Sequence, residues 1–429
     1  MYLKRIVLQD LKGIRSLDFS LARDNGRYEG WAVITGDNGA GKTALLRALA
    51  LAVVGPDVAR ALQPSLAGWI RRGAPRAEIA VEIVPSEDDR FAGGGRRYKE
   101  SFWAELDLVK NGGPEVSMTP ANHRKSKRKG PLNGPWAENT PGWFAAGYGP
   151  FRRLYGASPE AQRLMVGPSR VVRFATMFKE DATLGESELW LKDLHYKALE
   201  KRSREQALLD DVIELLNHDF LQNQIRVERI DSDGLWLKDA KGTVLPLADM
   251  SEGYRAALAM LVDIVRHMAA VYGLGENGKA LVAHDEGLVF VKHPGVVLID
   301  EVDVHFHPEW QRRIGFWLTE HFPNVQFIVT THSPLICQAT SPRCIYHLPA
   351  PSSDEEPRQL GEEAYAEIVR GTPTEIYRTA AFAMRRTRSD KAISARLEHA
   401  QLVAKERAVG LDAREREKMK QLDLFADPV

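Results

Sequence analysis

The chain has 429 residues, of which 44% are apolar and 27% charged, a composition that indicates a globular protein of two or three domains. No run of 18 apolar residues and no leading hydrophobic segment is present, so the sequence predicts neither a membrane span nor a signal peptide. Lys and Arg (58) balance Asp and Glu (58), so any nucleic-acid surface must be a local patch. The two cysteines, Cys337 and Cys344, are too few for a disulfide framework or a zinc site and favour a cytoplasmic location.

A glycine-rich loop near the start of the chain carries the strongest signal. The first part of the chain predicts three strands and a helix, over residues 2–8, 17–21, 31–35 and 44–52 in turn. Between the third strand and the helix lies Gly36–Thr43, which reads G-x-x-x-x-G-K-T, the pattern of a phosphate-binding loop. Lys42 is expected to reach the β- and γ-phosphates and Thr43 to hold Mg²⁺. The backbone cradle around the phosphates is expected to come from Asn38, Gly39, Ala40 and Gly41.

The region after this helix is less regular. We expect a helix over 58–72 and a strand over 77–84, and then Gly-, Pro- and charge-rich loops over 86–96 and 111–142. The second loop contains the basic run Arg124–Lys129. That run either contacts DNA phosphates or is a solvated, mobile loop.

A strand over 143–149 is expected to enter a turn at Tyr148–Arg153. A charged helical arm follows at about 187–220, with strands over 225–244, a helix over 254–272 and an irregular stretch over 273–292. Ser251, Glu252 and Gly253 precede that helix; Ser251 suits an N-cap, and Gly253 allows close approach of the backbone to a phosphate.

A second apolar strand, 296–299, ends in two carboxylates. Asp300 is expected to hold Mg²⁺, and Glu301 to polarise the attacking water as general base. After a helix over 308–320, a strand over 325–330 leads to His332, which is placed to contact the γ-phosphate. His305 and His307 flank Phe306, but no third metal ligand is evident, so a loop beside the nucleotide is the preferred interpretation.

The order of these motifs resembles that of ATP-binding-cassette (ABC) ATPases, in particular the soluble RecF/SMC/OLD-like branch of AAA-family ATPases. The segments that carry the resemblance are 8–14, with Lys12 near the phosphates; 250–255, a degenerate signature; 300–308, a Walker B motif with a D-loop containing Asp303 and His305; and 330–334, the switch. The resemblance implies an α/β P-loop NTPase with a mixed sheet flanked by helices, a small helical arm and a helical C-terminal tail.

One departure from the family pattern concerns the Q-loop. No clear glutamine is found, and Gly149, Arg152 and Arg153 stand at its place in the order. The resemblance also implies that Ser251, Glu252 and Gly253 act in trans, so that two ATP molecules are held between two chains of a homodimer. It further implies slow turnover, as in a clamp or switch.

We expect five divisions of the chain, namely 1–85, 86–142, 143–244, 245–350 and 351–429. Residues after His332 contain no strand-borne acidic set of the TOPRIM kind, so no nuclease is expected in this chain. The architecture resembles stand-alone ATPases of anti-phage defence systems of the Septu and PARIS types, which implies a separate effector, such as a nuclease. Residues 371–377 and the helical tail after them are the candidate docking surface.

The alternative function is DNA repair or replication. Gln421, Leu422, Asp423, Leu424 and Phe425 match the pentapeptide by which bacterial proteins bind the sliding clamp. Leucine and phenylalanine on a tail suit an apolar pocket of a partner. The competing interpretation of this segment is a helix end that packs on the body of the protein.

Overall fold

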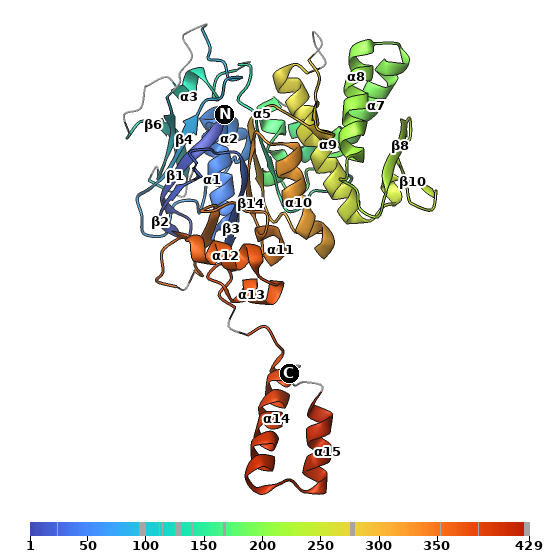
Figure 1. Cartoon of the computed structure of the whole chain (residues 1–429). Coiled ribbons are helices and arrows are strands. Elements are labelled where there is room, and N and C mark those ends of the chain that lie inside the picture. Colours follow the sequence, from blue (N-terminus) through green and yellow to red (C-terminus); the bar gives the residue numbers. More distant parts are fainter. Residues whose placement is uncertain are drawn as a thin grey trace.

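The computed structural model describes residues 1–23, 25–93, 100–110, 112–113, 115–124, 130–138, 140–165, 169–274, 279–351, 353–384 and 386–423. The central sheet has the order β16-β15-β3-β14-β13-β7, and all neighbours except β15 and β16 pair in parallel. Its strands are β16 (Arg358–Gln359), β15 (Ile345–Leu348), β3 (Gly30–Gly36), β14 (Val325–Thr330), β13 (Gly295–Ile299) and β7 (Ala145–Tyr148). The fold is therefore the expected α/β type, with a mixed sheet flanked by helices (Figure 1).

A second, antiparallel sheet has the order β2-β1-β4-β5-β6. Its strands are β2 (Ile14–Ser20), β1 (Tyr2–Leu11), β4 (Arg76–Val84), β5 (Phe102–Lys110) and β6 (Val116–Ala121). Helix α1 (Lys42–Val54) packs in the core that joins the two sheets, and all its residues except Thr43 and Arg47 are buried. An alanine- and leucine-rich helix that is apolar all round suits such a position.

The residues of β13 alternate between two cores. Val296 and Leu298 face the core that contains α1, whereas Val297 and Ile299 face the core that contains α9 (Glu252–Tyr272) and α10 (Pro308–His321). An uninterrupted apolar strand is expected when both faces of a parallel sheet are covered.

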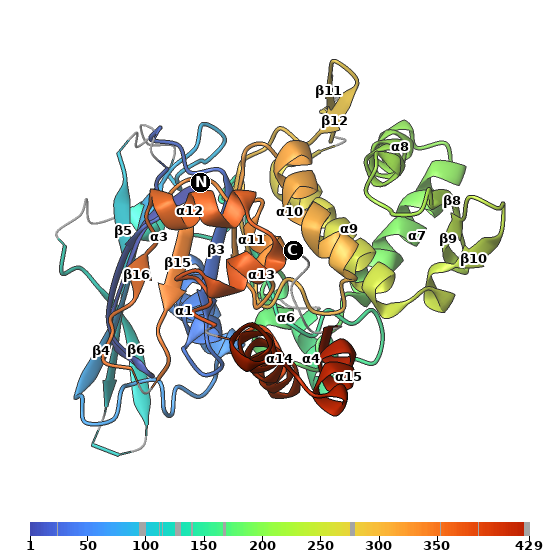
Figure 2. The same cartoon turned by 60° about the horizontal axis from the view of Figure 1, so that its bottom comes forward.

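Beside α9 lies the expected helical arm, made of α7 (Gly185–Leu199) and α8 (Ser203–Asn217), with a small sheet at its base (Figures 1 and 2). That sheet contains β10 (Val244–Pro246), β9 (Gly234–Lys238) and β8 (Arg226–Asp231). The remaining short elements are α2 (Pro56–Leu62), α3 (Gly130–Asn133), α4 (Pro159–Met165), α5 (Ser169–Val172), α6 (Ala175–Phe178), η1 (Leu247–Asp249), β11 (Ala283–Asp285), β12 (Leu288–Phe290) and α11 (Pro334–Cys337).

The C-terminal tail is helical, as expected. It comprises α12 (Glu362–Arg370), α13 (Pro373–Arg378), α14 (Asp390–Val409) and α15 (Ala413–Leu422). The last two form a hairpin that projects from the body in Figure 1, and neither helix contains a buried residue. Among the described residues, no helix is long and apolar enough to cross a membrane.

Three expectations about local structure were wrong. The helix expected over 58–72 ends at Leu62, because Gln63 precedes Pro64 and proline disfavours helical geometry in the preceding residue. The loop expected over 111–142 contains β6, which completes the antiparallel sheet by pairing with β5. The irregular stretch over 273–292 contains the β11-β12 hairpin.

Candidate nucleotide-binding site

The glycine-rich loop joins the carboxyl end of β3 to the first residue of α1. Gly39 (φ 80°) and Gly41 (φ 98°) adopt positive φ angles, which strongly favour glycine. Gly36 lies so close to Leu348 that an added Cβ would be 2.4 Å from its carbonyl oxygen. The loop, which contains Asn38 and Ala40, therefore leads directly into the first turn of α1, whose amides have no intrahelical acceptor, an arrangement suited to an anion cradle.

The side chain of Lys42 is folded back over this loop. It is buried, and its Nζ donates to the carbonyl oxygens of Gly36 (2.8 Å) and Asp37 (3.0 Å). Burial lowers the pKa of Lys42, against the opposing effect of the nearby Glu301 and Asp300 carboxylates. The structure thus brings the predicted lysine and both predicted carboxylates together.

Asp300 and Glu301 follow β13, and a single hydroxyl holds both. Thr330, the last residue of β14, donates to Asp300 Oδ1 (2.6 Å), and its oxygen accepts from the Glu301 amide (2.7 Å). Asp300 Oδ2 has no protein donor within the described part of the chain, which leaves a carboxylate oxygen, the ligand type that Mg²⁺ prefers. Asp300 therefore fits the predicted metal role, and the metal role of Thr43, the second residue of α1, stays a prediction.

The switch segment is tied to the D-loop. The Thr331 hydroxyl donates to Asp303 Oδ1, and the amide of His332 donates to the same oxygen at 3.4 Å. His332 follows β14, which lies between β3 and β13, so it stands between the phosphate loop and the carboxylates. Asp303 therefore connects the segment predicted to sense the γ-phosphate with the D-loop.

Arg152 organises the backbone of this region. Its guanidinium is buried and donates to the carbonyl oxygens of five residues, at 2.9 to 3.4 Å; these are Gly149, Asp300, Glu301, Val302 and Val304. Burial lowers its pKa to about 10, against the effect of the Asp303, Asp300 and Glu301 carboxylates. Arg153, by contrast, is exposed. Both arginines were candidates from the sequence, and the structure shows that Arg152 is the one that contacts the backbone of Asp300 and Glu301.

Glu301 itself has an unusual backbone, with a φ of 46°. Positive φ is rare outside glycine and persists where neighbouring contacts hold it. Here the Thr330 hydroxyl binds its amide and Arg152 binds its carbonyl. No sequence pattern predicted this backbone conformation of Glu301.

The signature residues lie next to the D-loop of the same chain. Ser251 is the N-cap residue of α9, as expected, but its side chain makes no capping hydrogen bond. Ser251 and Glu252 are exposed, and Glu252 Oε2 lies 3.6 Å from His305 Nδ1. A Cβ at Gly253 would lie 2.5 Å from the His305 carbonyl oxygen, so glycine is needed for this contact.

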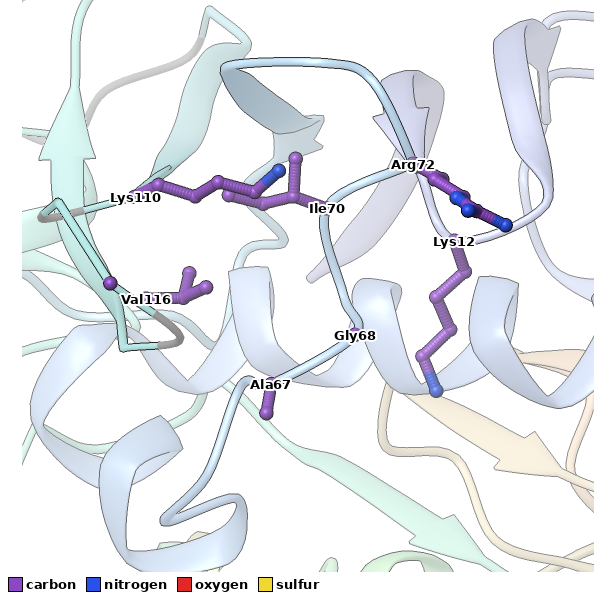
Figure 3. A pocket seen from close by; sticks show the side chains of 8 residues that line it. Lys12, Ala67, Gly68, Ile70, Arg72, Lys110 and Val116 are labelled. Atoms are coloured by element: carbon purple, nitrogen blue, oxygen red, sulfur yellow. The ribbon is translucent and has the colours of Figure 1, made fainter.

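Lys12 occupies the turn between β1 and β2, with its Nζ 4.6 Å from the centre of the Trp69 ring. Burial lowers its pKa, and Arg47 lowers it further. Figure 3 shows the Lys12 side chain running away from Arg72 at the edge of a hollow of about 580 Å³. Ile14, two residues on, lies 3.4 Å from the Cβ position of Gly41, so this turn is adjacent to the glycine-rich loop. Contact of Lys12 with phosphate stays a prediction.

The other candidate residues lie outside this site. Arg124 pairs with Glu78 and Glu105 on the antiparallel sheet, and Lys125–Lys129 lie outside the described residues. His307 accepts from the Glu309 amide at 3.3 Å as the N-cap of α10, and no cluster of three metal-ligating side chains occurs in the described ranges.

The clamp-binding pentapeptide is described only in part. Gln421 and Leu422 end α15, and Asp423 accepts from His399 at 2.8 Å within the hairpin. Leu424 and Phe425 lie outside the described residues.

Comparison with protein families gives a match to the family described as "AAA domain, putative AbiEii toxin, Type IV TA system" over residues 32–338. The chain is 23% identical to "Septu protein PtuA" of Bacillus mycoides (strain KBAB4) over 339 residues, which cover 78% of this chain and 38% of that protein. It is 31% identical to "Retron Vc95 probable ATPase" of Vibrio cholerae serotype O1 biovar El Tor over 154 residues, covering 35% and 27%. This chain thus matches well under half the length of either relative.

Among solved structures, the chain is similar to "Crystal structure of the SmcHead bound to the C-winged helix domain of ScpA" (TM-score 0.47, 15% identity), covering 86% of this chain and 100% of that chain. It is also similar to "SMC head domain from Thermotoga maritima" (TM-score 0.41, 14% identity), covering 81% and 94%.

Proposed function

Because the chain belongs to the AAA-domain family that matches residues 32–338, we propose that it hydrolyses ATP with Mg²⁺ at the edge formed by β3, β14 and β13. Lys42 binds the phosphates, and Thr43 and Asp300 hold Mg²⁺, which neutralises charge on the phosphate oxygens. Glu301 accepts a proton from the attacking water, and His332 senses the γ-phosphate. The observation that carries this proposal is the Thr330 hydroxyl, which holds Asp300 and Glu301 together in the field of Lys42.

The proposed assembly is a homodimer that closes around ATP. Ser251 and Glu252 are exposed beside the D-loop, where a second copy of the chain can receive them. Closure of this kind would make the γ-phosphate a contact between chains, so that hydrolysis removes a contact and opens the assembly.

The state of the nucleotide is proposed to reach a separate effector through the segment after His332. Helix α11 follows the switch, and Gln338 at its end donates to the carbonyl oxygen of Gly371 (3.3 Å). Residues 371–377, which include all of α13 except its last residue, Arg378, are the proposed docking surface. The matches to "Septu protein PtuA" and "Retron Vc95 probable ATPase" support an ATPase of the anti-phage defence type. The cytoplasmic location and the partner nuclease are parts of the proposal.

The second candidate function is DNA repair or replication through recruitment to the sliding clamp. It is favoured by Gln421 and Leu422, the last residues of α15, which belongs to a hairpin that projects from the body in Figure 1. Direct DNA contact through 124–129 belongs to this alternative.

The test uses an N-terminally tagged Glu301→Gln chain in its native host, with Lys42→Ala as the matched control. We expect Glu301→Gln to retain ATP and lose turnover by about 10²–10⁴-fold, the contribution of a general base. It should co-purify, in ATP only, with a second copy of the chain and with an effector identified by mass spectrometry. Lys42→Ala should bind neither ATP nor the effector.

Full ATPase activity in Glu301→Gln would refute the general-base assignment. Recovery of the sliding clamp in place of an effector, and its loss on Leu424→Ala/Phe425→Ala, would favour the second function.

A further inference from the structure

A hollow of about 600 Å³ lies between α5, α9 and the segments 135–138 and 140–143. Trp143, in its wall, precedes the first residue of β7, so the hollow lies at the amino end of that strand. The glycine-rich loop lies at the carboxyl ends of the parallel strands. In Figure 1, α5 is near the top of the body and α11 near its base, which agrees with this separation. The hollow is therefore distinct from the proposed ATP site.

Arg173 lines this hollow and has an unsatisfied charge. The residue is 6% exposed, and its Nε and Nη1 atoms are buried without a hydrogen-bond partner among the described residues. Burial, together with the nearby Arg170, lowers its pKa to about 10. Burial of an unpaired cation lowers the stability of the folded protein, and an anionic ligand that pairs with the guanidinium would remove this cost.

The other polar groups of the hollow leave its net charge positive. Arg170 donates to the Pro135 carbonyl oxygen (2.8 Å). The exposed carboxylate of Glu138, at the rim, raises the pKa of Arg170 against the lowering effect of burial. His267 is buried and lies 3.4 Å from Asp263, whose charge is already paired with Arg266. Two arginines thus face the two exposed carboxylates of Glu138 and Asp57, and Asp57 is already paired with Arg60.

The remaining walls are apolar. Val58, Pro141, Trp143 and Val271 line the hollow, and its volume lies within the usual range of small-molecule pockets, about 300–1,000 Å³. A ligand that matches this lining has an anionic group for the arginines and a flat or apolar body for the walls. Arginine pairs favour phosphate because the planar guanidinium binds two oxygens at once.

We propose that this hollow binds a small phosphomonoester with an aromatic or apolar body, of the mononucleotide class. The phosphate is held by Arg173 and Arg170, and the body lies against Trp143 and Val271. The bound molecule touches the carboxyl-terminal part of α9 through Val271, whereas the signature residues lie at the amino end of this helix.

The experiment uses full-length Lys42→Ala protein, so that the proposed ATP site is disabled and its failure is not confused with failure of this site. Isothermal titration is performed with AMP, inorganic phosphate and adenosine as probes. We expect AMP and phosphate to bind and adenosine to bind about tenfold more weakly than AMP or not at all. Adding Arg173→Gln should weaken AMP binding by about 10- to 100-fold, the effect of removing a charge-assisted hydrogen bond.

The matched control is Arg163→Gln, an exposed arginine of α4 that does not line the hollow. It should leave AMP binding unchanged. If Arg173→Gln does not fold, Arg170→Ala at the rim is measured in its place and should show the same direction. Absence of AMP and phosphate binding, or equal binding in the arginine variants, overturns the proposal. Binding of a 5′-phosphorylated oligonucleotide without binding of AMP would also overturn it, in favour of a nucleic-acid end.

Discussion

Two buried arginines near the ends of β7 differ in one respect. Arg152 follows the strand at its carboxyl end, and Arg173 accepts from the Gly147 amide through its own carbonyl (2.8 Å). Burial lowers the pKa of each guanidinium to about 10. Arg152 donates to five backbone carbonyls through Nη1 and Nη2, and only its Nε lacks a partner, whereas both Nε and Nη1 of Arg173 have no partner in the described part of the chain.

The difference shows that burial alone does not assign a role to a charged side chain. Where protein acceptors satisfy the charge, as around Arg152, the arginine fixes a local backbone, here the one that carries Glu301. Where they do not, as around Arg173, the charge is left for a ligand. The partners of a buried charge, more than its depth, separate a structural role from a binding role.

The largest effect on stability is expected from Asp263, a buried carboxylate that contacts Tyr148, the last residue of β7. Asp263 accepts from the Tyr148 hydroxyl (3.0 Å) and Arg266 (2.7 Å), and lies 3.4 Å from His267. Asp263→Asn leaves buried partners without their countercharge and should lower the free energy of unfolding by about 3–5 kcal/mol. Chemical denaturation measures the free energy of unfolding of this variant and of the control Asp210→Asn, at an exposed position of α8. The control should be as stable as the wild type.

The same carboxylate predicts a dependence on pH. Burial opposes its ionisation, but His267 and Arg266 together hold its pKa below the ordinary value. Because the folded-state pKa is lowered, the stabilisation is present above the unfolded-state pKa and is lost as pH falls through the folded-state value. Asp263→Asn should therefore flatten the acid limb of the stability profile; an unchanged acid limb would contradict this.

Arg152→Met sharpens the contrast between the two arginines. It removes the donor to five carbonyls, so we expect a loss of about 3 kcal/mol in stability and a fall in kcat with little change in KM for ATP. Arg153→Met changes the exposed neighbour and should behave as wild type. Equal behaviour of the two variants would show that the hydrogen bonds of Arg152 do not position Glu301.

Gly253→Ala tests the contact between signature and D-loop. The new Cβ would meet the His305 carbonyl oxygen at 2.5 Å, so one segment must move, at a cost of about 1–3 kcal/mol. Turnover at saturating ATP should fall, and the free energy of unfolding should fall by the same 1–3 kcal/mol, about the cost of overpacking. Gly361→Ala, which meets nothing within 4 Å, is the control; full activity in Gly253→Ala would show that the D-loop tolerates the shift.

The sequence predicted the parts of the molecule whose chemistry depends on contiguous residues. Gly36–Thr43, the strand before Asp300 and the strand before His332 each combine a local pattern with a required residue type. Parallel strands bring their carboxyl ends together, so three separate motifs were expected at one edge, and the structure places them there.

Features that depend on contacts distant in sequence could not be predicted. The acceptors of Arg152 are carbonyl oxygens up to 152 positions away, and any residue supplies a carbonyl. The lack of a described partner at Nε and Nη1 of Arg173 has no sequence pattern. The β6 strand was hidden by its glycine- and proline-rich surroundings, and only pairing with β5 determines it.

The smallest effect on stability is expected from a third arginine, Arg124. Its substitution tests whether this side chain has a structural role or binds DNA. Arg124 heads the basic run but pairs with Glu78 and Glu105 and lies over the Trp103 ring (4.8 Å). Since its side chain is a quarter exposed, Arg124→Ala should lower stability by only about 1 kcal/mol. Its charge is already matched by two carboxylates, so any DNA affinity of the chain and its salt dependence should not change. A loss of DNA affinity in Arg124→Ala, measured by fluorescence anisotropy, would mean that the arginine leaves these carboxylates for phosphate.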